Sequence, residues 1–228
     1  MSYSTLYPLI KKTGSKLPPE QFQSIINIVF HDYEAHHYDD MHSDMWESLQ
    51  EQFNLLVNDL FEKNGCDFQD LSLLDVGCGT GLSTQIVLNT ILGLSIKDIT
   101  LLDTSPVMLK YAKEKADKWG KNYTIMNSEV SGLNEKYDII IICSVLHHIP
   151  NLEQFLLEID TILKHGGILI HLQDPSGDNR NNESYLKRCK EYSNEVNSPN
   201  KPKGIKSLIP KKLKNYIKRK LGKKNYID

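Results

Sequence analysis

Five short apolar segments alternate with helical segments in the middle of the chain, and this alternation constrains the fold more than any other feature. Most of the segments are apolar on both faces of an extended strand; they are residues 71–76, 98–103, 122–127, 137–145 and 166–174. Strands that are apolar throughout are typical of a parallel sheet covered by helices on both faces. The sequence therefore predicts an α/β protein with a doubly wound, mostly parallel sheet.

Composition divides the chain into three regions. Residues 1–66 begin with an expected loose arm, residues 1–17, and continue with two amphipathic cap helices over 18–40 and 43–65. Residues 67–175 hold the strands and are predicted to bind the ligand. Residues 176–228 are expected to form a basic, helical end. The second cap helix is predicted to start at Ser43, to end at Gly65 and to bury a stripe of five residues, which are Trp46, Leu49, Phe53, Leu56 and Leu60.

Charge is distributed unevenly along the chain. The net charge is −2, yet residues 201–228 contain eleven Lys or Arg and one acid, so the remainder is strongly acidic. Residues 209–222 are predicted to form a basic helix with an apolar stripe. Such a segment could bind phosphate backbones, an anionic membrane or an acidic partner, and its stripe favours packing. The acidic body makes nucleic acid an unfavoured partner.

No long apolar run predicts a membrane span, and the first residues do not resemble a secretory signal. The four cysteines are scattered, which argues against disulfides and zinc and favours a cytoplasmic protein. Residues 31–42, HDYEAHHYDDMH, could form a metal cluster by composition. On a helix, His31 and His42 are too far apart to share an ion with the others without a turn, so a polar helix face is favoured and no metal is predicted.

A glycine-rich turn follows the first predicted strand in residues 73–84, LLDVGCGTGLST. In parallel sheets, ligands bind at the carboxyl ends of strands where the strand order reverses. Gly77, Gly79 and Gly81 allow a tight turn and predict backbone N–H groups that are open to a ligand. The spacing is G-x-G-x-G rather than the dinucleotide G-x-G-x-x-G, and no Walker Lys is present. With Asp75 before the turn, this favours a ligand without phosphate.

A second acid, Asp103, ends the second predicted strand. An acid at about 20 residues from such a turn accepts hydrogen bonds from ribose hydroxyls. The alternative role is that of an acid at a helix N-terminus beside Ser105, the predicted N-cap. Next to the glycine turn the ribose role is favoured, and a nucleoside without phosphate points to S-adenosylmethionine.

Residues 71–173 resemble the class I S-adenosylmethionine-dependent methyltransferases of the small-molecule type. The glycine turn resembles the first family motif, and LLDTSPVML (101–109) resembles the acidic second strand. YDIIIICSVLHHIP (137–150) resembles the fourth strand with its following segment, and LKHGGILI (163–170) resembles the fifth. The resemblance implies a Rossmann-like fold, S-adenosylmethionine as cofactor and S-adenosylhomocysteine as product. It says almost nothing about the methyl acceptor.

The resemblance also implies which residues bind the cofactor. Gly77 and Gly79 would face its methionyl and ribose parts, Asp75 would lie near its amino group, and Asp103 would hold the ribose diol. Further contacts would come from Cys78, Thr104 and Ser105 in the first two turns, from Ser128, Glu129 and Val130 near the adenine, and from Cys143 and Ser144 near the methionyl group. Methyltransferases of this type cover the cofactor with N-terminal helices, which makes Tyr33, Tyr38 and His42 lid candidates; Tyr38 is the one that we expect to touch the cofactor.

His147 and His148 follow the fourth predicted strand at the ligand-binding edge. An imidazole there could act as a general base, since it titrates near neutral pH; the alternative is structural packing. The sequence thus predicts methyl transfer to a small metabolite or natural product. The alternatives are a nucleic-acid methyltransferase and a cofactor-binding subunit without catalysis.

The family's sixth and seventh strands are not evident in residues 174–228. Either the chain is a fragment of a longer protein or its sheet is shortened. A shortened sheet would expose its fifth strand, which we expect the C-terminal helices or a second copy to cover.

Overall fold

The computed structural model describes residues 6–41, 43–64, 68–174, 182–184, 186, 187 and 190. The chain divides into two compact units. The first contains Asn27–Gln173 together with Met1, and the second contains Ser2–Ile26 and the chain from Asp174 onward. The first unit thus joins the sheet with much of the predicted cap, and the three regions expected from composition stay a prediction.

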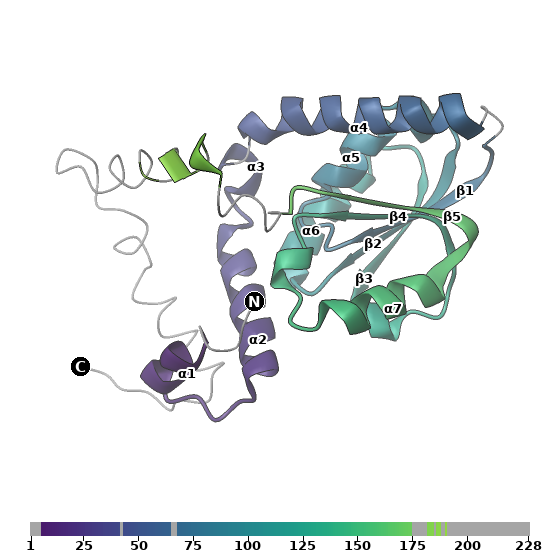
Figure 1. Ribbon diagram of the computed structural model, residues 1–228. Helices are drawn as coiled ribbons and strands as arrows, with labels where there is room; N and C mark the ends of the chain where they lie inside the picture. Colours follow the sequence, from purple (N-terminus) through teal and green to yellow (C-terminus); the bar gives the residue numbers. More distant parts are fainter. Residues whose placement is uncertain are drawn as a thin grey trace. The chain divides into compact units, whose positions relative to one another are not determined.

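Five strands form one sheet in the first unit (Figure 1): β1 (Leu71–Val76), β2 (Ile96–Asp103), β3 (Asn122–Asn127), β4 (Tyr137–Cys143) and β5 (Leu163–Leu172). Their order is β3-β2-β1-β4-β5, and every neighbouring pair is parallel. The chain moves outward from β1 to β3 and then crosses to β4, so the strand order reverses between β1 and β4. This confirms the predicted doubly wound Rossmann-like sheet.

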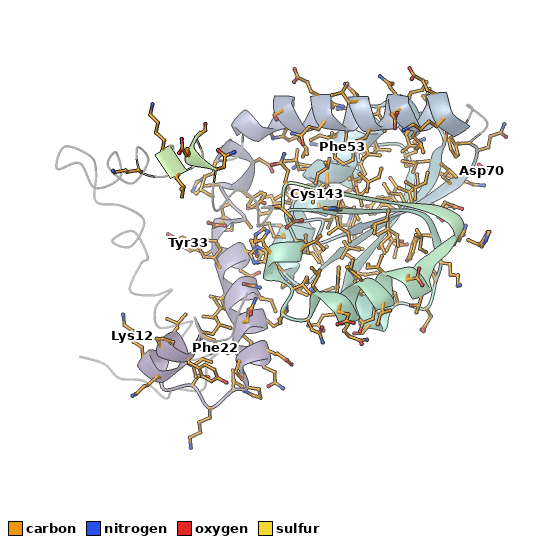
Figure 2. All side chains as sticks on the ribbon, in the orientation of Figure 1. Lys12, Phe22, Tyr33, Phe53, Asp70 and Cys143 are labelled. Atoms are coloured by element: carbon orange, nitrogen blue, oxygen red, sulfur yellow. The ribbon has the colours of Figure 1, made fainter. Side chains whose placement is uncertain are left out.

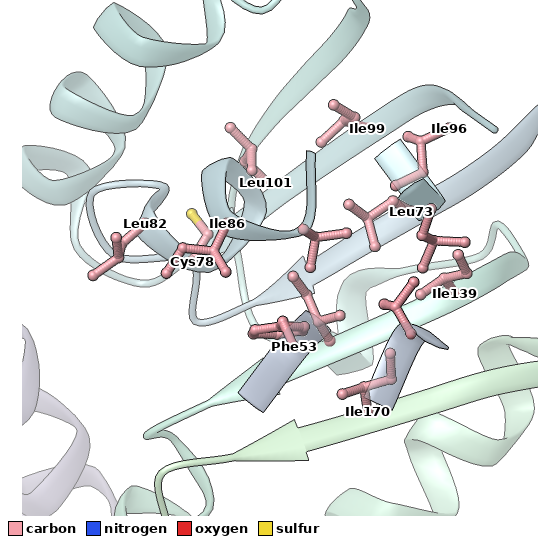
Figure 3. Close-up of a cluster of buried hydrophobic side chains, with 14 of the residues drawn as sticks. Phe53, Leu73, Cys78, Leu82, Ile86, Ile96, Ile99, Leu101, Ile139 and Ile170 are labelled. Carbon is pink, nitrogen blue, oxygen red and sulfur yellow. The ribbon is translucent and has the colours of Figure 1, made fainter. Parts of the chain in front are cut away.

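Helices cover both faces of the sheet (Figure 1). On one face lie α4 (Ser43–Asn64), α5 (Leu82–Leu88) and α6 (Pro106–Ala116), packed with the 3-10 turn η2 (Ile91–Leu94) on a core with buried side chains from β1, β2, β4 and β5 (Figure 3). Tyr123 and Ile125 of β3 are partly buried against the same core. On the other face, α7 (Leu152–Ile162) and the 3-10 turn η3 (Val130–Gly132) pack on a second core. The sheet is thus the middle layer of three, with buried contacts on both sides.

The buried stripe of α4 differs from the predicted one. Leu49 and Phe53 are buried as expected, but the stripe continues through Val57 and Phe61, whereas Leu56 is 43% exposed. The observed residues are spaced four apart and form a single ridge along the helix. The prediction differed from the structure from Leu56 onward, because apolar residues spaced either three or four apart lie on one face of a helix.

Element boundaries differ from expectation by a few residues. The sequence predicts a helix over residues 151–164 with Asn151 as its N-cap. In the structure this helix, α7, ends at Ile162, and β5 begins at once with Leu163, three residues before the predicted start at 166. Ser105 and Asn151 cap their helices as predicted: their side chains accept hydrogen bonds from the N–H groups of Met108 and Gln154.

The N-terminal segment contains more regular structure than predicted, since α1 (Tyr7–Thr13) forms within the expected loose arm. α2 (Pro19–Glu34) begins in the second unit and ends in the first, where α3 (Tyr38–Met41) follows it. Gly65 and the expected basic helix 209–222 lie outside the described residues, as does most of the region in which further strands would follow β5. Among the described helices, none has the length and apolar character needed to cross a membrane.

Candidate functional site

The glycine turn after β1 is bonded to the end of β2. The N–H groups of Gly77 and Cys78 both donate to the Leu102 carbonyl, at 2.8 and 3.0 Å, and the Gly81 N–H donates to the Cys78 carbonyl at 2.7 Å. The Gly79 N–H donates to Asp103 Oδ2 at 2.8 Å. The expectation that these N–H groups are open to a ligand is therefore wrong, because the end of β2 accepts from Gly77 and Gly79 and the turn itself accepts from Gly81. A turn with these donors occupied is poorly suited to hold a phosphate.

The three glycines have different reasons to be glycine. All adopt left-handed backbone conformations, with φ of 67°, 53° and 82° for Gly77, Gly79 and Gly81. A Cβ on Gly77 would lie 2.4 Å from Val145 Cγ2, whereas no described atom lies within 4 Å of a Cβ built on Gly79. Gly77 therefore allows close packing against the segment after β4, and Gly79 borders open space.

Asp103, at the end of β2, is fixed by two backbone donors. Its Oδ2 accepts from Gly79 and its Oδ1 accepts from the Ser105 N–H at 2.7 Å. Each carboxylate oxygen can accept a further hydrogen bond, and the side chain is half-buried. Burial raises the pKa of Asp103, while the two N–H groups and nearby His31 act in the opposite direction. The structure thus presents a positioned acceptor pair beside the open side of Gly79.

Asp75, at the end of β1, lies fully buried below the turn. Its Oδ2 accepts hydrogen bonds from the hydroxyls of Ser83 and Thr84, both at 2.6 Å, in the first turn of α5. Its Oδ1 has no hydrogen-bond partner among the described residues. Burial raises the pKa of Asp75 to about 6, although these hydroxyl bonds lower it. Asp75 joins β1 to α5, and its predicted contact with a cofactor stays a prediction.

Two predicted contact residues direct their side chains into the core. Cys78 belongs to the core shared with α4 and α5 (Figure 3), and Val130 belongs to the core under α7. Burial raises the pKa of the Cys78 thiol well above its ordinary value, so it is a core thiol. Either residue could contact a ligand through its backbone alone.

The other predicted contact residues lie at or just after the strand ends. Glu129 is exposed, while Ser128 is half-buried and donates to the Glu129 carbonyl at 2.8 Å. Cys143 ends β4 (Figure 2) and is half-buried, as are Thr104 and Ser144. Ser144 adopts a left-handed φ of 59°, and its N–H donates to the Leu172 carbonyl. These residues therefore lie at the carboxyl ends of the strands, as predicted, and their contacts with a cofactor stay a prediction.

Tyr38, on α3, is the lid candidate whose surroundings include Asp103 at the end of β2. Burial raises the pKa of its phenol, and the charges of Glu34, Asp103 and Asp39 raise it further. The phenol therefore keeps its proton at neutral pH and can donate a hydrogen bond. Tyr33 is 36% exposed on α2 (Figure 2), and His42 lies outside the described residues.

Three imidazole rings meet between α2 and the segment after β4. The His147 and His148 ring centroids are 4.0 Å apart, and His31 meets His148 edge-on at 5.2 Å. The sequence singled out the first two and missed His31 as their neighbour. Among the described residues, no three His, Cys, Asp or Glu side chains are placed to hold a metal ion.

The residues that join the cap to the turns were also missed. Ser105 Oγ donates to Asp32 Oδ1 at 2.6 Å, and Thr80 Oγ1 donates to Asp39 Oδ1 at 2.6 Å. The Lys115 ammonium lies 2.6 Å from Asp39 Oδ2. The acids of residues 31–42 were visible in the sequence, but nothing in their spacing indicated partners so distant along the chain.

Comparison with known proteins agrees with this geometry. Residues 74–169 match the family described as methyltransferase domain. A ubiquinone biosynthesis O-methyltransferase of Rickettsia bellii is 34% identical over 121 residues, which cover 53% of this chain and 47% of the relative. A malonyl-[acyl-carrier protein] O-methyltransferase of Acetivibrio thermocellus is 30% identical over 99 residues, which cover 43% and 34%. The chain thus spans about half or less of the length of these relatives.

Solved structures share the fold at low sequence identity. The DhpI-SAM-HEP complex matches with a TM-score of 0.50 and 17% identity, covering 75% of this chain and 72% of that one. A methyltransferase in complex with a methyltransferase activator from Haloferax volcanii matches with a TM-score of 0.52 and 17% identity, covering 69% and 66%.

The sheet order and the site at its switch point define a Rossmann-like fold, which the chain shares with solved methyltransferase structures. The residues that match the methyltransferase domain family, 74–169, contain the glycine turn, Asp103 and the segment after β4.

Proposed function

We propose that the chain is an enzyme that transfers the methyl group of S-adenosylmethionine to an oxygen atom of a small molecule. The observation that carries the proposal is the pairing of Asp103 with the glycine turn. Asp103 is fixed by Gly79 and Ser105 with acceptor capacity left on both oxygens. A ribose diol offers two hydroxyl donors at the spacing of one carboxylate, which is the role of an acid at this position.

The residues of the turn fit this cofactor better than a phosphate ligand. The N–H groups that would hold a phosphate are already bonded to Leu102, Cys78 and Asp103. The space beside Gly79 is clear of described atoms, so an uncharged sugar can approach the backbone there. Contacts by Asp75, Thr104, Ser128, Glu129, Cys143, Ser144 and Tyr38, and by the backbones of Cys78 and Val130, belong to the same proposal.

Bound S-adenosylmethionine supplies a methyl group on a sulfonium whose departure leaves a neutral thioether. The chain's part is to hold the acceptor oxygen, the methyl carbon and the sulfur in line, since alignment contributes much of the rate. A hydroxyl acceptor that took the methyl group would have to lose its proton to a base of the chain. His147 or His148, both half-buried after β4, accepts that proton.

The names of similar proteins support a small-molecule acceptor with an oxygen nucleophile. Two of them are O-methyltransferases, and prosolanapyrone synthase of Alternaria solani is 27% identical over 123 residues. A nucleic-acid acceptor rests on the basic segment 201–228 alone. That alternative, a non-catalytic cofactor-binding subunit, and the cytoplasmic location stay predictions.

Calorimetry on the full chain tests the cofactor. We expect S-adenosylhomocysteine to bind with micromolar affinity and NAD to give no heat, because the turn lacks the dinucleotide spacing. Tight binding of NAD with no response to S-adenosylhomocysteine would overturn the proposal. Incubation with S-adenosylmethionine and a panel of phenols, carboxylic acids and acyl carrier proteins, read by mass spectrometry, then identifies the acceptor.

A further inference from the structure

Asp39, on the short helix α3, is held by two elements of the methyltransferase core. Its Oδ1 accepts a hydrogen bond from Thr80 Oγ1 at 2.6 Å, and its Oδ2 pairs with Lys115 Nζ at 2.6 Å. Lys115 also donates to Thr80 Oγ1 at 3.1 Å, which closes a three-membered network. We call Asp39, Thr80 and Lys115 the latch.

Each member of the latch comes from a different functional element. Thr80 is a residue of the glycine turn and is 1% exposed. Lys115 is on α6, the helix that follows the Asp103 loop, and its side chain is 21% exposed. Asp39 directly follows Tyr38, whose pKa is raised by burial and by charges that include Asp103. The latch therefore connects the cap to the two turns that form the cofactor site.

The position of Lys115 makes it more than a surface charge. Its ammonium also lies 5.7 Å from the ring centroid of Trp46 on α4, within the range of a cation–π interaction. The same helix carries Lys113, which pairs with Asp117 at 3.0 Å, but there both side chains are more than half exposed. Exposed pairs of that kind contribute little, so Lys113 provides a matched control on the same helix.

We propose that Lys115 is a positioning residue for cofactor binding: through Asp39 it holds Tyr38 over the strand ends, so that closure of the cap and occupancy of the cofactor site are coupled. This inference rests on the proposed function. Coupling is reciprocal. A bound cofactor must therefore stabilise the closed latch by the same factor by which the closed latch strengthens cofactor binding.

Two variants test the coupling by calorimetry with S-adenosylhomocysteine. We expect Lys115→Met and Asp39→Asn each to weaken binding about five- to tenfold, within the usual range of coupling between sites. The double variant should be no more than about twofold weaker than the weaker single variant, because both changes open the same latch. Lys113→Met should bind like the wild type. If the wild type binds and Lys115→Met binds as tightly as Lys113→Met, the coupling through the latch is overturned, while the proposed function is not.

A second readout does not need a bound cofactor. The chain has two tryptophans, and Trp119→Phe leaves Trp46, beside the latch, as the sole tryptophan whose fluorescence is excited selectively. In that background we expect acrylamide to quench Trp46 more strongly in Lys115→Met than in Lys113→Met, and S-adenosylhomocysteine to reduce quenching only while Lys115 is present. Equal quenching in both variants would overturn the latch. A wild type that binds neither S-adenosylmethionine nor its product would overturn the proposed function. The quenching of Trp46 in the cofactor-free variants would still show whether the latch exists.

Discussion

The strands β1 and β2 are neighbours and each carries an aspartate near its carboxyl end, yet the two acids have opposite surroundings. Asp75 is fully buried, bonded to the hydroxyls of Ser83 and Thr84, and its pKa is raised to about 6. Asp103 is half-buried and held by backbone N–H groups. One acid joins a strand to its following helix, and the other has acceptor capacity left for a ligand.

The difference shows how one residue type serves two purposes at neighbouring strand ends. The turn after β1 lies over its own acid, and the N–H groups of Gly77, Cys78 and Gly79 donate to the end of β2. The turn after β2 leaves its acid at the edge. Asp103 and the open side of Gly79 are therefore the parts of the two turns that we propose a ligand contacts.

The largest effect is expected from alanine in the glycine turn. Gly77→Ala should destabilise the fold by about 3 kcal/mol, since its Cβ would overlap Val145 and its φ is left-handed. Gly79→Ala should cost only about 1 kcal/mol, the backbone strain alone. Chemical denaturation measures both. Equal losses would show that the two glycines do not differ in the way that their surroundings indicate.

Asp103→Ala should lower affinity for S-adenosylhomocysteine by about 2 to 3 kcal/mol, as for hydrogen bonds to a charged group. Calorimetry gives the affinity, and a melting curve of the same sample shows whether the fold is retained. A change below about threefold in a folded variant would assign Asp103 to the support of the turns and remove the contrast with Asp75.

Asp75→Asn should change how stability depends on pH. The folded-state pKa of Asp75 is raised to about 6. The protonated carboxyl therefore stabilises the fold fully below the ordinary pKa of an aspartate, and this stabilisation is lost as pH rises through 6. The variant, which has no such group, should therefore gain about 2 kcal/mol relative to the wild type between pH 4 and 7. Melting curves across that range measure the difference.

Asp138→Asn is the control for that experiment. Burial alone would raise the pKa of Asp138, but hydrogen bonds from Lys164 and Ser72 lower it. The charged carboxylate therefore stabilises the fold, and this stabilisation is lost as pH falls. Asp138→Asn should accordingly lose stability relative to the wild type as pH rises, the opposite of Asp75→Asn. If Asp75→Asn shows no pH trend and weakens cofactor binding more than tenfold, then Asp75 Oδ1 contacts the cofactor, as the family resemblance implies.

The smallest effect is expected at two helix caps. Ser105→Ala removes the cap of α6 and the bond to Asp32, whereas Asn151→Ala removes only the exposed cap of α7. We expect losses of about 1 to 2 and about 0.5 to 1 kcal/mol of unfolding free energy. A larger loss for Asn151→Ala than for Ser105→Ala would contradict the view that the hydrogen bond from Ser105 to Asp32 stabilises the turn after β2.

Local patterns in the sequence predicted most of the sheet. The bounds of β1 and β3 were predicted to the residue, because both lie between clear turn signals. The caps at Ser105 and Asn151 were found because an N-cap depends on neighbours three residues away. The stripe of α4 and the start of β5 were less accurate, since packing partners distant in sequence decide between adjacent helical ridges and between helix and strand at Leu163.

What the sequence determined by itself was the alternation of strands and helices, the place of the glycine turn and the presence of an acid at the end of each of the first two strands. Periodicity and turn chemistry act over a few residues, so a single chain records them directly. Only the tertiary structure decided that the N–H groups of the turn's glycines are already bonded, which aspartate is buried, and that Asp39 meets Lys115 and His31 meets His148. Those pairings join segments dozens of residues apart, and they depend on where the sheet places its strand ends.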